Sequence, residues 1–290
     1  MANYRIMTDS CCDLTQSMAD ELNLTVAPLT VNFKGQEFQN FLDGRTLNTK
    51  DFYKGLRDGE LTSTAAANPS LWAETMKPAL EAGDDILVLA FSSGLSTTCN
   101  AARIAAEELL ETYPDRKIYV VDTLCASMGQ GLLCWHAADR KAKGASLEEV
   151  RDFCEENKLN LAHWFTVDDL HFLKRGGRIS AATAMVGSLL QIKPVLHVDD
   201  EGHLISVSKA RGRKAAIQAL AAKVGEDAFA PEDQVMFISH GDCLEDAEHL
   251  ASILKETYHV PEVCISYVGP VIGSHSGPGT LALFYLGKKR

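Results

Sequence analysis

Residues 85–98 read DILVLAFSSGLSTT, an apolar run followed by five hydroxyl side chains. The apolar run over 85–91 predicts a buried strand, and the Ala-, Leu- and Glu-rich segment 97–111 predicts a helix. The hydroxyls therefore lie on a strand-to-helix turn, where backbone N–H groups are free and a helix N-terminus favours anions. The turn suits a carboxylate or a phosphate, although Ser96 could also serve only as an N-cap.

Strand and helix patterns alternate on both sides of this turn. Strands are predicted at 4–8, 25–33 and 117–121, and helices at 68–82 and 128–143. Such alternation predicts a mostly parallel sheet with helices on both faces, an α/β fold. Ligands of these sheets bind beyond the carboxyl ends of the strands.

Small polar residues follow three of these strands. If the strands are neighbours, their exits converge on one crevice, and this predicts where a ligand binds. The simpler alternative is that these side chains cap the helices that follow. The candidates for the crevice are Asp9, Ser10, Ser92, Ser93, Thr97 and Asp122.

The second half of the chain has a different pattern. After a helix over 146–156 that Ser146 caps, short strands are predicted at 162–167, 194–198, 203–209, 234–239 and 262–268, with helices at 213–225 and 244–257. The sequence Asp199-Asp200-Glu201-Gly202 predicts a hairpin turn. With 290 residues, we expect an N-terminal α/β domain over 1–158 and a C-terminal α+β domain over 159–290, with a mixed or antiparallel sheet.

Composition excludes several classes of function. A net charge of −11 argues against general nucleic-acid binding, and no apolar run is long enough to span a bilayer. The start lacks the form of a secretion signal, so we expect a cytoplasmic protein. The eight cysteines form no C-x-x-C pair and the nine histidines show no ligand spacing, so no metal or cofactor is expected.

Positive charge is concentrated in one region. From Lys174 to Lys214 there are eight Lys or Arg and three Asp or Glu, a local balance of 8 − 3 = +5. The runs at 175–178 and 209–214 pair arginines with glycines, which lets the backbone approach a partner while a guanidinium binds a phosphate or carboxylate. A solvated surface is the alternative interpretation.

Several short motifs are spread over essentially the whole chain. They are Thr8-Asp9-Ser10, Ser92-Ser93-Gly94-Leu95-Ser96, Val121-Asp122-Thr123, Leu173 to Ile179, Lys193-Pro194-Val195-Leu196, the basic run 209–214 and Ile272 to Gly279. In order and spacing these motifs resemble the DegV family, the fatty-acid-binding subunits of bacterial fatty acid kinase. The sequence departs from the family pattern where Thr97-Thr98-Cys99 replaces the usual Gly-Thr-Tyr.

The resemblance implies a two-domain protein that encloses one acyl chain between its domains. It implies that Thr64 and Ser96 bind the carboxyl group, with Thr62 or Ser63 as alternatives to Thr64, and that His275 belongs to the same hydrogen-bond network and can supply a proton or positive charge. A separate kinase subunit would then use ATP to phosphorylate the bound long-chain fatty acid, so this chain would have no catalytic residue of its own. The residues expected to face that kinase are Arg175, Arg178, Lys209 and Arg211.

Two further expectations concern the cavity. Glycines around His275 predict a loop over 273–279 that closes over the ligand. The run Ala181 to Leu190 could line the acyl tunnel or simply pack in the core.

The competing hypothesis is a self-sufficient phosphotransferase or hydrolase that uses Asp9, Ser96 and His275. However, neither a G-x-x-x-x-G-K-[ST] nor a G-x-S-x-G motif occurs in the sequence.

Overall fold

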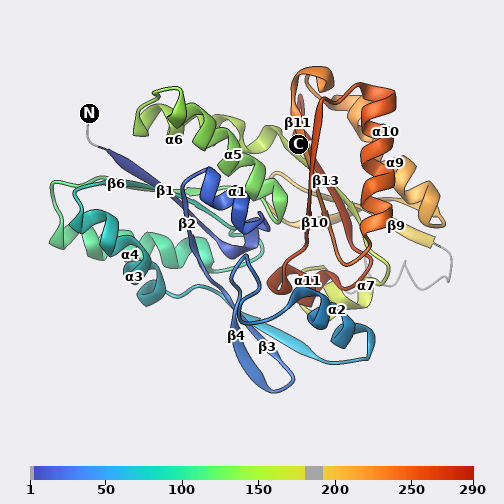
Figure 1. Ribbon diagram of the computed structural model, residues 1–290, viewed down its shortest axis with the longest axis horizontal. Helices are drawn as coiled ribbons and strands as arrows, with labels where there is room; N and C mark the ends of the chain where they lie inside the picture. Colours follow the sequence, from blue (N-terminus) through green and yellow to red (C-terminus); the bar gives the residue numbers. More distant parts are fainter. Residues whose placement is uncertain (1–2, 180–191) are drawn as a thin grey trace.

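The computed structural model describes residues 3–179 and 192–290, and these contain three β-sheets (Figure 1). Sheets of four and three strands come from residues before 123, and a six-stranded sheet comes from residues after 160. The predicted division after residue 158 lies between these sets of strands, in the 3-10 helix η2 (Lys158–Asn160). The run Ala181 to Leu190, named above as a tunnel wall, lies outside the described residues.

The four-stranded sheet is parallel and has helices on both faces, as the alternating pattern predicts. Its order is β2 (Leu24–Ala27), β1 (Tyr4–Asp9), β6 (Asp85–Ala90) and β7 (Ile118–Asp122). Ile86 and Val88 pack toward α3 (Pro69–Glu81) and α4 (Thr98–Thr112). Leu87 and Leu89 point the other way, toward α5 (Met128–Ala142) and α6 (Leu147–Asn157).

The single strand predicted over 25–33 is wrong. The chain leaves β2 at Ala27 and starts a separate strand, β3 (Thr30–Phe33), which lies between β4 (Gln36–Gln39) and β5 (Thr62–Ala65) in the small antiparallel sheet. Pro28 separates the two strands, because proline lacks the N–H that would continue a ladder. The break matters for function, since the small sheet carries Thr64.

The six-stranded sheet is mixed, as expected for the second half. Its order is β10 (Leu204–Arg211), β9 (Ile192–Val198), β8 (Leu161–Thr166), β13 (Leu281–Leu286), β11 (Val235–His240) and β12 (Glu262–Tyr267). Strands β9 and β10 form the predicted hairpin, and Gly202 has the positive φ of +78° that the turn requires. Only β11 and β12, among the described pairs of this sheet, run parallel.

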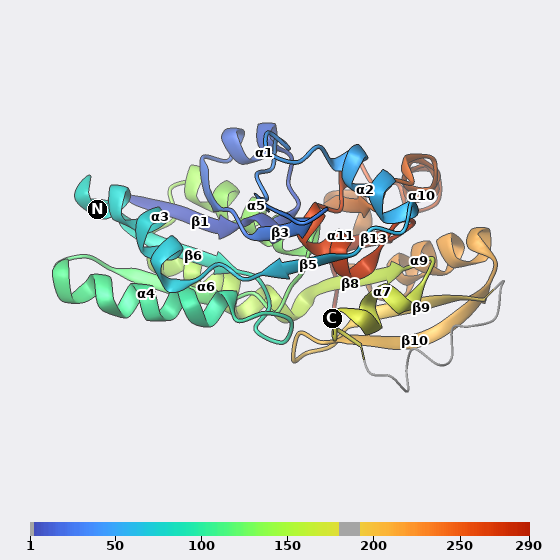
Figure 2. The ribbon, with the colours of Figure 1, turned by 90° about the horizontal axis from the view of Figure 1, so that it is seen from below.

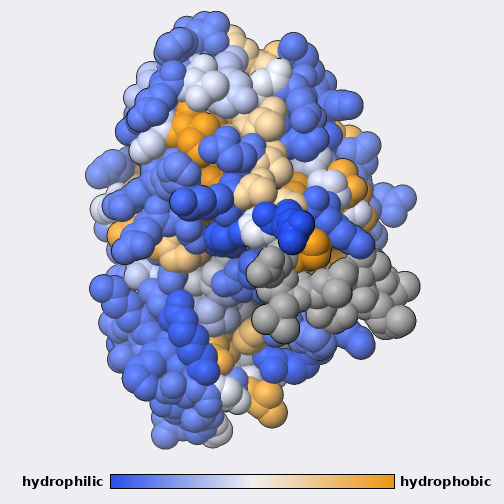
Figure 3. Space-filling model, turned by 90° about the vertical axis from the view of Figure 1, so that its right-hand side faces the viewer, coloured by the Kyte–Doolittle hydropathy of each residue, from blue (hydrophilic) through white to orange (hydrophobic). Residues whose placement is uncertain are grey.

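Sequence patterns did not reveal β13, a central strand of this sheet. Its residues Leu281 to Tyr285 are all buried, so no alternation of apolar and polar side chains marks it. One face of the sheet is covered by α9 (Arg213–Asp227) and α10 (Leu244–Tyr258), whose outer surface is largely hydrophilic (Figures 2 and 3). The other face meets α5, which lies between the two large sheets.

The predicted loop around His275 is instead a helix, α11 (Pro270–Ser276). Proline at the first helical position suits a helix start, and Gly277, with φ of +78°, ends it. Helix α11 packs against α2 (Thr49–Arg57) and α7 (Leu170–Arg175), and Gly273 permits this contact because a Cβ there would lie 2.7 Å from the Tyr53 hydroxyl. The other short helices of the described residues are η1 (Ser10–Cys12), α1 (Gln16–Glu21) and η4 (Pro231–Asp233).

The turn between β9 and β10 is fastened to the first half of the chain. Ser92 Oγ donates to the carbonyl oxygen of Gly202 at 2.9 Å, and a Cβ on Gly202 would lie 2.1 Å from that hydroxyl. The buried guanidinium of Arg290 donates to the carbonyl of Asp199 at 3.1 Å and to that of Leu124 at 2.8 Å. These hydrogen bonds therefore hold the hairpin turn against the hydroxyl turn.

We expect Arg290→Ala to lower the free energy of unfolding by about 2 kcal/mol, because it leaves buried carbonyl groups without their charged donor. Urea denaturation of the full chain measures this. The exposed Lys289 provides the control, since Lys289→Ala removes a positive charge without a buried contact. Equal midpoints for the two variants would contradict the role of Arg290.

Candidate functional site

A cavity of about 450 Å³ lies between the two halves of the chain. This volume is within the range of about 300–1,000 Å³ that is usual for small-molecule sites. Its walls are mainly apolar and come from both large sheets, from the small sheet and from α11. The apolar lining includes Leu29, Phe91, Leu95, Phe165, Leu173, Val198, Leu204, Val268, Val271, Ile272, Ala282 and Phe284.

The hydroxyl turn forms one polar part of the wall, through Ser93, Ser96 and Thr97. Ser96 Oγ accepts from the backbone N–H of Thr98 at 3.2 Å and shares a hydrogen bond with the Thr98 hydroxyl at 2.9 Å. The residue that caps α4 is Thr97, whose side chain makes no capping bond. The positive end of a 15-residue helix therefore faces this part of the cavity.

A second polar element approaches the cavity from the small sheet. Thr64 Oγ1 and His275 Nε2 are hydrogen-bonded at 2.8 Å, and both residues line the cavity. Strand β5 places Thr64 opposite Val31, so Ser63 points to the other side of the sheet. Of the three hydroxyls that remained open, Thr62, Ser63 and Thr64, it is Thr64 that lines the cavity.

Close packing fixes the ring of His275. A Cβ on Gly176 would lie 2.1 Å from His275 Nδ1, so the position beside the ring requires glycine. The backbone of Gly176 is helical and would accept any residue, so the contact with the ring is what requires glycine here. Within the described chain, Nδ1 is buried without a hydrogen-bond partner.

His275 is uncharged in this environment. Burial, together with repulsion from the nearby Arg178 and Arg175, lowers its pKa to about 4. The expectation that His275 supplies a positive charge is therefore corrected: at neutral pH it offers a neutral imidazole. The positive charge at the cavity comes from Arg178.

The basic residues fall into two groups. Arg178 lines the cavity, half-buried, and its Nε donates to the carbonyl of Leu95 at 3.2 Å. Arg178 was expected to face the kinase at the surface, whereas the structure places it in the cavity wall. Arg175 is exposed and lies over the Phe172 ring, 4.9 Å from its centroid, while Lys209 and Arg211 are exposed on the edge strand β10.

Four of the proposed crevice residues lie behind the cavity wall: Asp9, Ser10, Ser92 and Asp122 are not among its lining residues. The strand exits do converge, but these side chains bind backbone instead. Asp9 accepts from the N–H groups of Phe91 at 2.8 Å and Cys11 at 3.0 Å, and burial raises its pKa to about 6. Asp122 accepts from the N–H of Ser93 at 3.1 Å. They shape the loops that carry Ser93 and Ser96.

The competing enzyme hypothesis needs Asp9, Ser96 and His275 to act together. Asp9 is buried behind the wall, Ser96 bonds to Thr98, and His275 bonds to Thr64. Nucleophile and base must lie within hydrogen-bond reach of each other. The described residues do not form such an arrangement.

Sequence patterns missed a polar group that joins the two halves. Asp13 accepts from the N–H of Gly269 at 3.0 Å and from the hydroxyl of Ser127 at 2.5 Å, and Ser127 also bonds to the hydroxyl of Ser239 at 2.8 Å. Burial raises the pKa of Asp13 to about 7. Ser127 and Ser239 line the cavity. Only the position of Asp13 just after the first strand exit could have signalled this group.

Comparison with known proteins identifies the family. The family model described as "Uncharacterised protein, DegV family" matches residues 3–288. The chain belongs to the DegV family. A DegV domain-containing protein of Clostridium perfringens is 46% identical over 287 residues, which cover 99% of this chain and 98% of that protein.

Solved DegV structures have the same fold. A structure titled as fatty acid binding of a DegV family protein from Thermus thermophilus is 31% identical, with a TM-score of 0.86, and the match covers 97% of this chain and 98% of that one. The fatty acid kinase (Fak) B3 protein of Streptococcus pneumoniae, loaded with linoleic acid, is 23% identical with a TM-score of 0.87, and the match covers 98% and 99%. That second similarity concerns the fold.

The described residues contain neither a cluster of metal ligands nor a helix suited to a membrane. Over residues 3–179 and 192–290, no three or more His, Cys, Asp or Glu side chains are grouped so that they could hold a metal ion. In the same residues, no helix has both the length and the apolar character needed to cross a bilayer.

We predict that the imidazole of His275 titrates near pH 4 in the folded protein. Because the unfolded chain takes up this proton near pH 6.5, the contribution of neutral His275 to stability is full above that pH and is lost as the pH falls toward 4. Histidine NMR over pH 3.5–8, with His275→Gln to assign the signal, measures it. Titration near pH 6.5 would contradict the buried, neutral ring.

Proposed function

We propose that this chain binds a long-chain fatty acid in the cavity and presents its carboxyl group to a separate fatty acid kinase subunit. The observation that carries the proposal is the Thr64–His275 hydrogen bond of 2.8 Å at the polar part of an otherwise apolar cavity. Membership of the DegV family and the fatty acid binding named for the Thermus thermophilus relative support it.

The apolar walls account for affinity. Burying a saturated chain gains roughly 0.8 kcal/mol per CH₂ before ordering costs, so about 10 kcal/mol for an ordinary long chain. Phe91, Phe165, Phe284, Leu173 and Val271 come from different elements but line the same cavity, where they offer such a chain apolar contact. The tail thus supplies binding energy, and the polar part supplies orientation.

The polar part accounts for the head group. A carboxylate removed from water must be hydrogen-bonded or neutralised. The hydroxyls of Thr64 and Ser96 can donate to it, since neutral His275 with its Nε2 proton would orient Thr64 as donor toward the ligand. The positive end of α4 and the guanidinium of Arg178 add favourable electrostatics without a formal charge on the histidine.

The chain has a surface suited to a kinase partner. Arg175, Lys209 and Arg211 are exposed, and exposed positive charges promote transient docking and can stabilise charge during phosphoryl transfer. The kinase itself would provide ATP and the catalytic groups, so this chain would act as a binding subunit in the cytoplasm. The acid is the ligand, and no other cofactor is required by the proposal.

Mass spectrometry of the denatured protein tests the binding function: we expect about one acyl chain for each protein after expression in bacteria. Thr64→Ala and Ser96→Ala should each lower fatty acid affinity about tenfold or more, because each removes a hydrogen bond to a charged group. Ser63→Ala is the matched control, since Ser63 is the exposed neighbour of Thr64 on the same strand. Lipid-free protein, or equal loss in the control, would contradict the proposal.

The two arginines of the 175–178 segment should separate binding from transfer. We expect Arg175→Ala to keep the fatty acid and to lower the rate of acyl-phosphate formation with the kinase, because Arg175 is exposed. Arg178→Ala should lower fatty acid affinity itself, because this side chain lines the cavity. Retained lipid and the coupled kinase assay report the two effects, and the reverse pattern would show that the roles are assigned wrongly.

A further inference from the structure

Thr98 is a buried residue directly behind the hydroxyl turn. It is the first residue of α4, it is 0% exposed, and it is not among the residues that line the cavity. Its backbone N–H and its hydroxyl both bond to Ser96 Oγ, at 3.2 Å and 2.9 Å. Ser96 itself is half-buried and lines the cavity. Two groups of one buried residue therefore meet the oxygen that is proposed to bind the ligand.

The direction of the bond between the two hydroxyls follows from burial. On distance alone, either oxygen could be the donor. A buried donor without an acceptor costs free energy, so the proton of the Thr98 hydroxyl needs a partner. This side chain is closed to solvent, and in the part of the chain that the structure describes its only hydrogen-bond partner is Ser96 Oγ. We therefore assign Thr98 as the donor in this bond.

Ser96 is then the acceptor in both bonds and gives its own proton to neither. That proton remains available to a ligand in the cavity, and a carboxylate offers only acceptors. With the opposite direction, Ser96 would give its proton to Thr98 and would present a lone pair to the carboxylate. A hydroxyl that accepts a hydrogen bond also becomes a stronger donor in the next one. The same oxygen can thus accept from the start of α4 and donate to an acid.

The protein fixes Thr98 from its other side. The indole N–H of Trp72, which is fully buried, donates to the carbonyl oxygen of Thr98 at 3.1 Å. Trp72 belongs to α3, and α3 packs against α4. The position of Thr98 is therefore set by the scaffold before any ligand binds.

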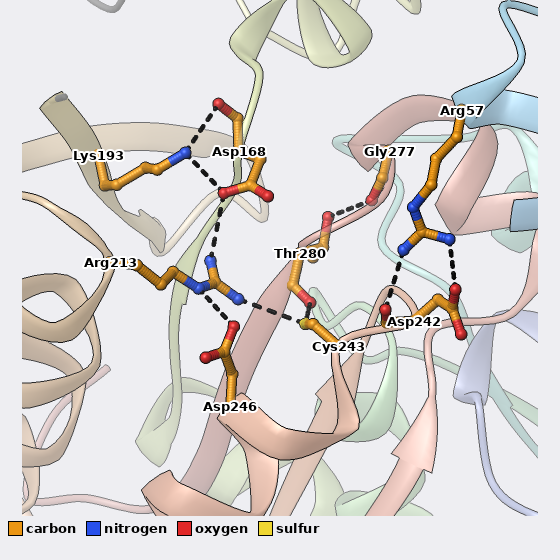
Figure 4. Close-up of polar contacts among 9 residues, drawn as sticks. All are labelled: Arg57, Asp168, Lys193, Arg213, Asp242, Cys243, Asp246, Gly277 and Thr280. Atoms are coloured by element: carbon orange, nitrogen blue, oxygen red, sulfur yellow. Dashed lines mark hydrogen bonds and ion pairs between the residues drawn. The ribbon is translucent and has the colours of Figure 1, made fainter. Parts of the chain in front are cut away.

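The other proposed donor has a different partner. Thr64 bonds to His275, and the end of the helix that carries His275 is held by the bond from the Thr280 hydroxyl to the carbonyl of Gly277 at 2.8 Å (Figure 4). Each of the two ligand hydroxyls thus has its own partner in the protein. A change in the Thr98 hydroxyl should therefore act on Ser96 and leave the Thr64 pair intact.

We propose that Thr98 is a positioning residue, which turns the hydroxyl of Ser96 toward the carboxyl group of the ligand as a hydrogen-bond donor. The inference rests on the proposed fatty-acid binding and adds to it a residue that does not touch the acid. It makes the two interpretations of Ser96, helix cap and ligand contact, compatible with each other.

Equilibrium binding of hexadecanoic acid to the delipidated full chain tests the role of this hydroxyl. We expect Thr98→Val, which keeps the branched shape and the N–H, to lower the affinity about fivefold, the ratio that one net hydrogen bond of about 1 kcal/mol gives. Thr98→Ser retains the hydroxyl and should restore the natural affinity. Thr75→Val is the matched control, since the Thr75 hydroxyl donates to the carbonyl of Leu71 at 2.7 Å within α3.

Double variants separate positioning from a general effect on the fold. In the Ser96→Ala background, Thr98→Val should cause no further loss of affinity, because the hydroxyl that it positions is gone. In the Thr64→Ala background, the same substitution should still lower the affinity about fivefold, since Thr64 has His275 as its partner. A merely structural role would give equal losses in the two backgrounds.

The other outcomes overturn the inference. Natural affinity in Thr98→Val, or a further loss in the Ser96→Ala background, would show that Ser96 does not depend on the Thr98 hydroxyl, while fatty-acid binding by the natural chain would stand. Should Thr98→Val not fold, Thr98→Ala removes the same hydroxyl and replaces it in each comparison. Failure of the natural chain to bind hexadecanoic acid would instead overturn the proposed function itself.

Discussion

The hydrogen bond between Thr64 and His275 is the contact on which the site depends. It joins a strand of the small sheet to a helix that comes 211 residues later in the chain. Its geometry requires close packing on the far side of the ring, where Gly176 leaves room for His275 Nδ1 and nothing larger. A single pair thus fixes the relation of β5, α7 and α11, and the cavity lies where these elements meet the two large sheets.

The electrostatics of the site follow from that packing. Burial and two nearby arginines keep the imidazole neutral, so it can orient a hydroxyl but cannot neutralise an anion. Neutralisation of the proposed carboxylate ligand would then fall to Arg178 and to the N-terminus of α4. The chain as a whole has a net charge of −11, so the positive charge at the cavity is a local feature.

Sequence patterns predicted what local periodicity encodes. The alternating strands and helices, the hydroxyl turn and the β9–β10 hairpin all have short-range signals, and the structure contains them. Strand β13 had none, because both its faces are buried. The helical state of His275 was hidden by the glycines at 273 and 277, which serve close packing against Tyr53 and the helix end rather than a loop. The break between β2 and β3 does have a sequence signal, because Pro28 lies inside the predicted strand and proline disfavours the interior of a strand.

Which polar residues face the cavity could not be predicted, because that depends on where each hydrogen bond goes. Asp9 and Asp122 are residues of the type and position expected in a ligand site, yet their carboxylates bind backbone N–H groups of the loop that follows β6. Burial raises the pKa of Asp9 to about 6 and that of Asp13 to about 7. Ionising them in the fold is therefore unfavourable, and the stability that their protonated forms add below pH 3.8 is lost as the pH rises through these values. Hydrogen bonds from backbone N–H groups offset part of the free energy that burial of the carboxylates costs. The same bonds hold the loop that carries Ser93 and Ser96 in one conformation. The buried acids thus belong to the scaffold, whereas the hydroxyls of Thr64, Ser93, Ser96 and Thr97 line the cavity.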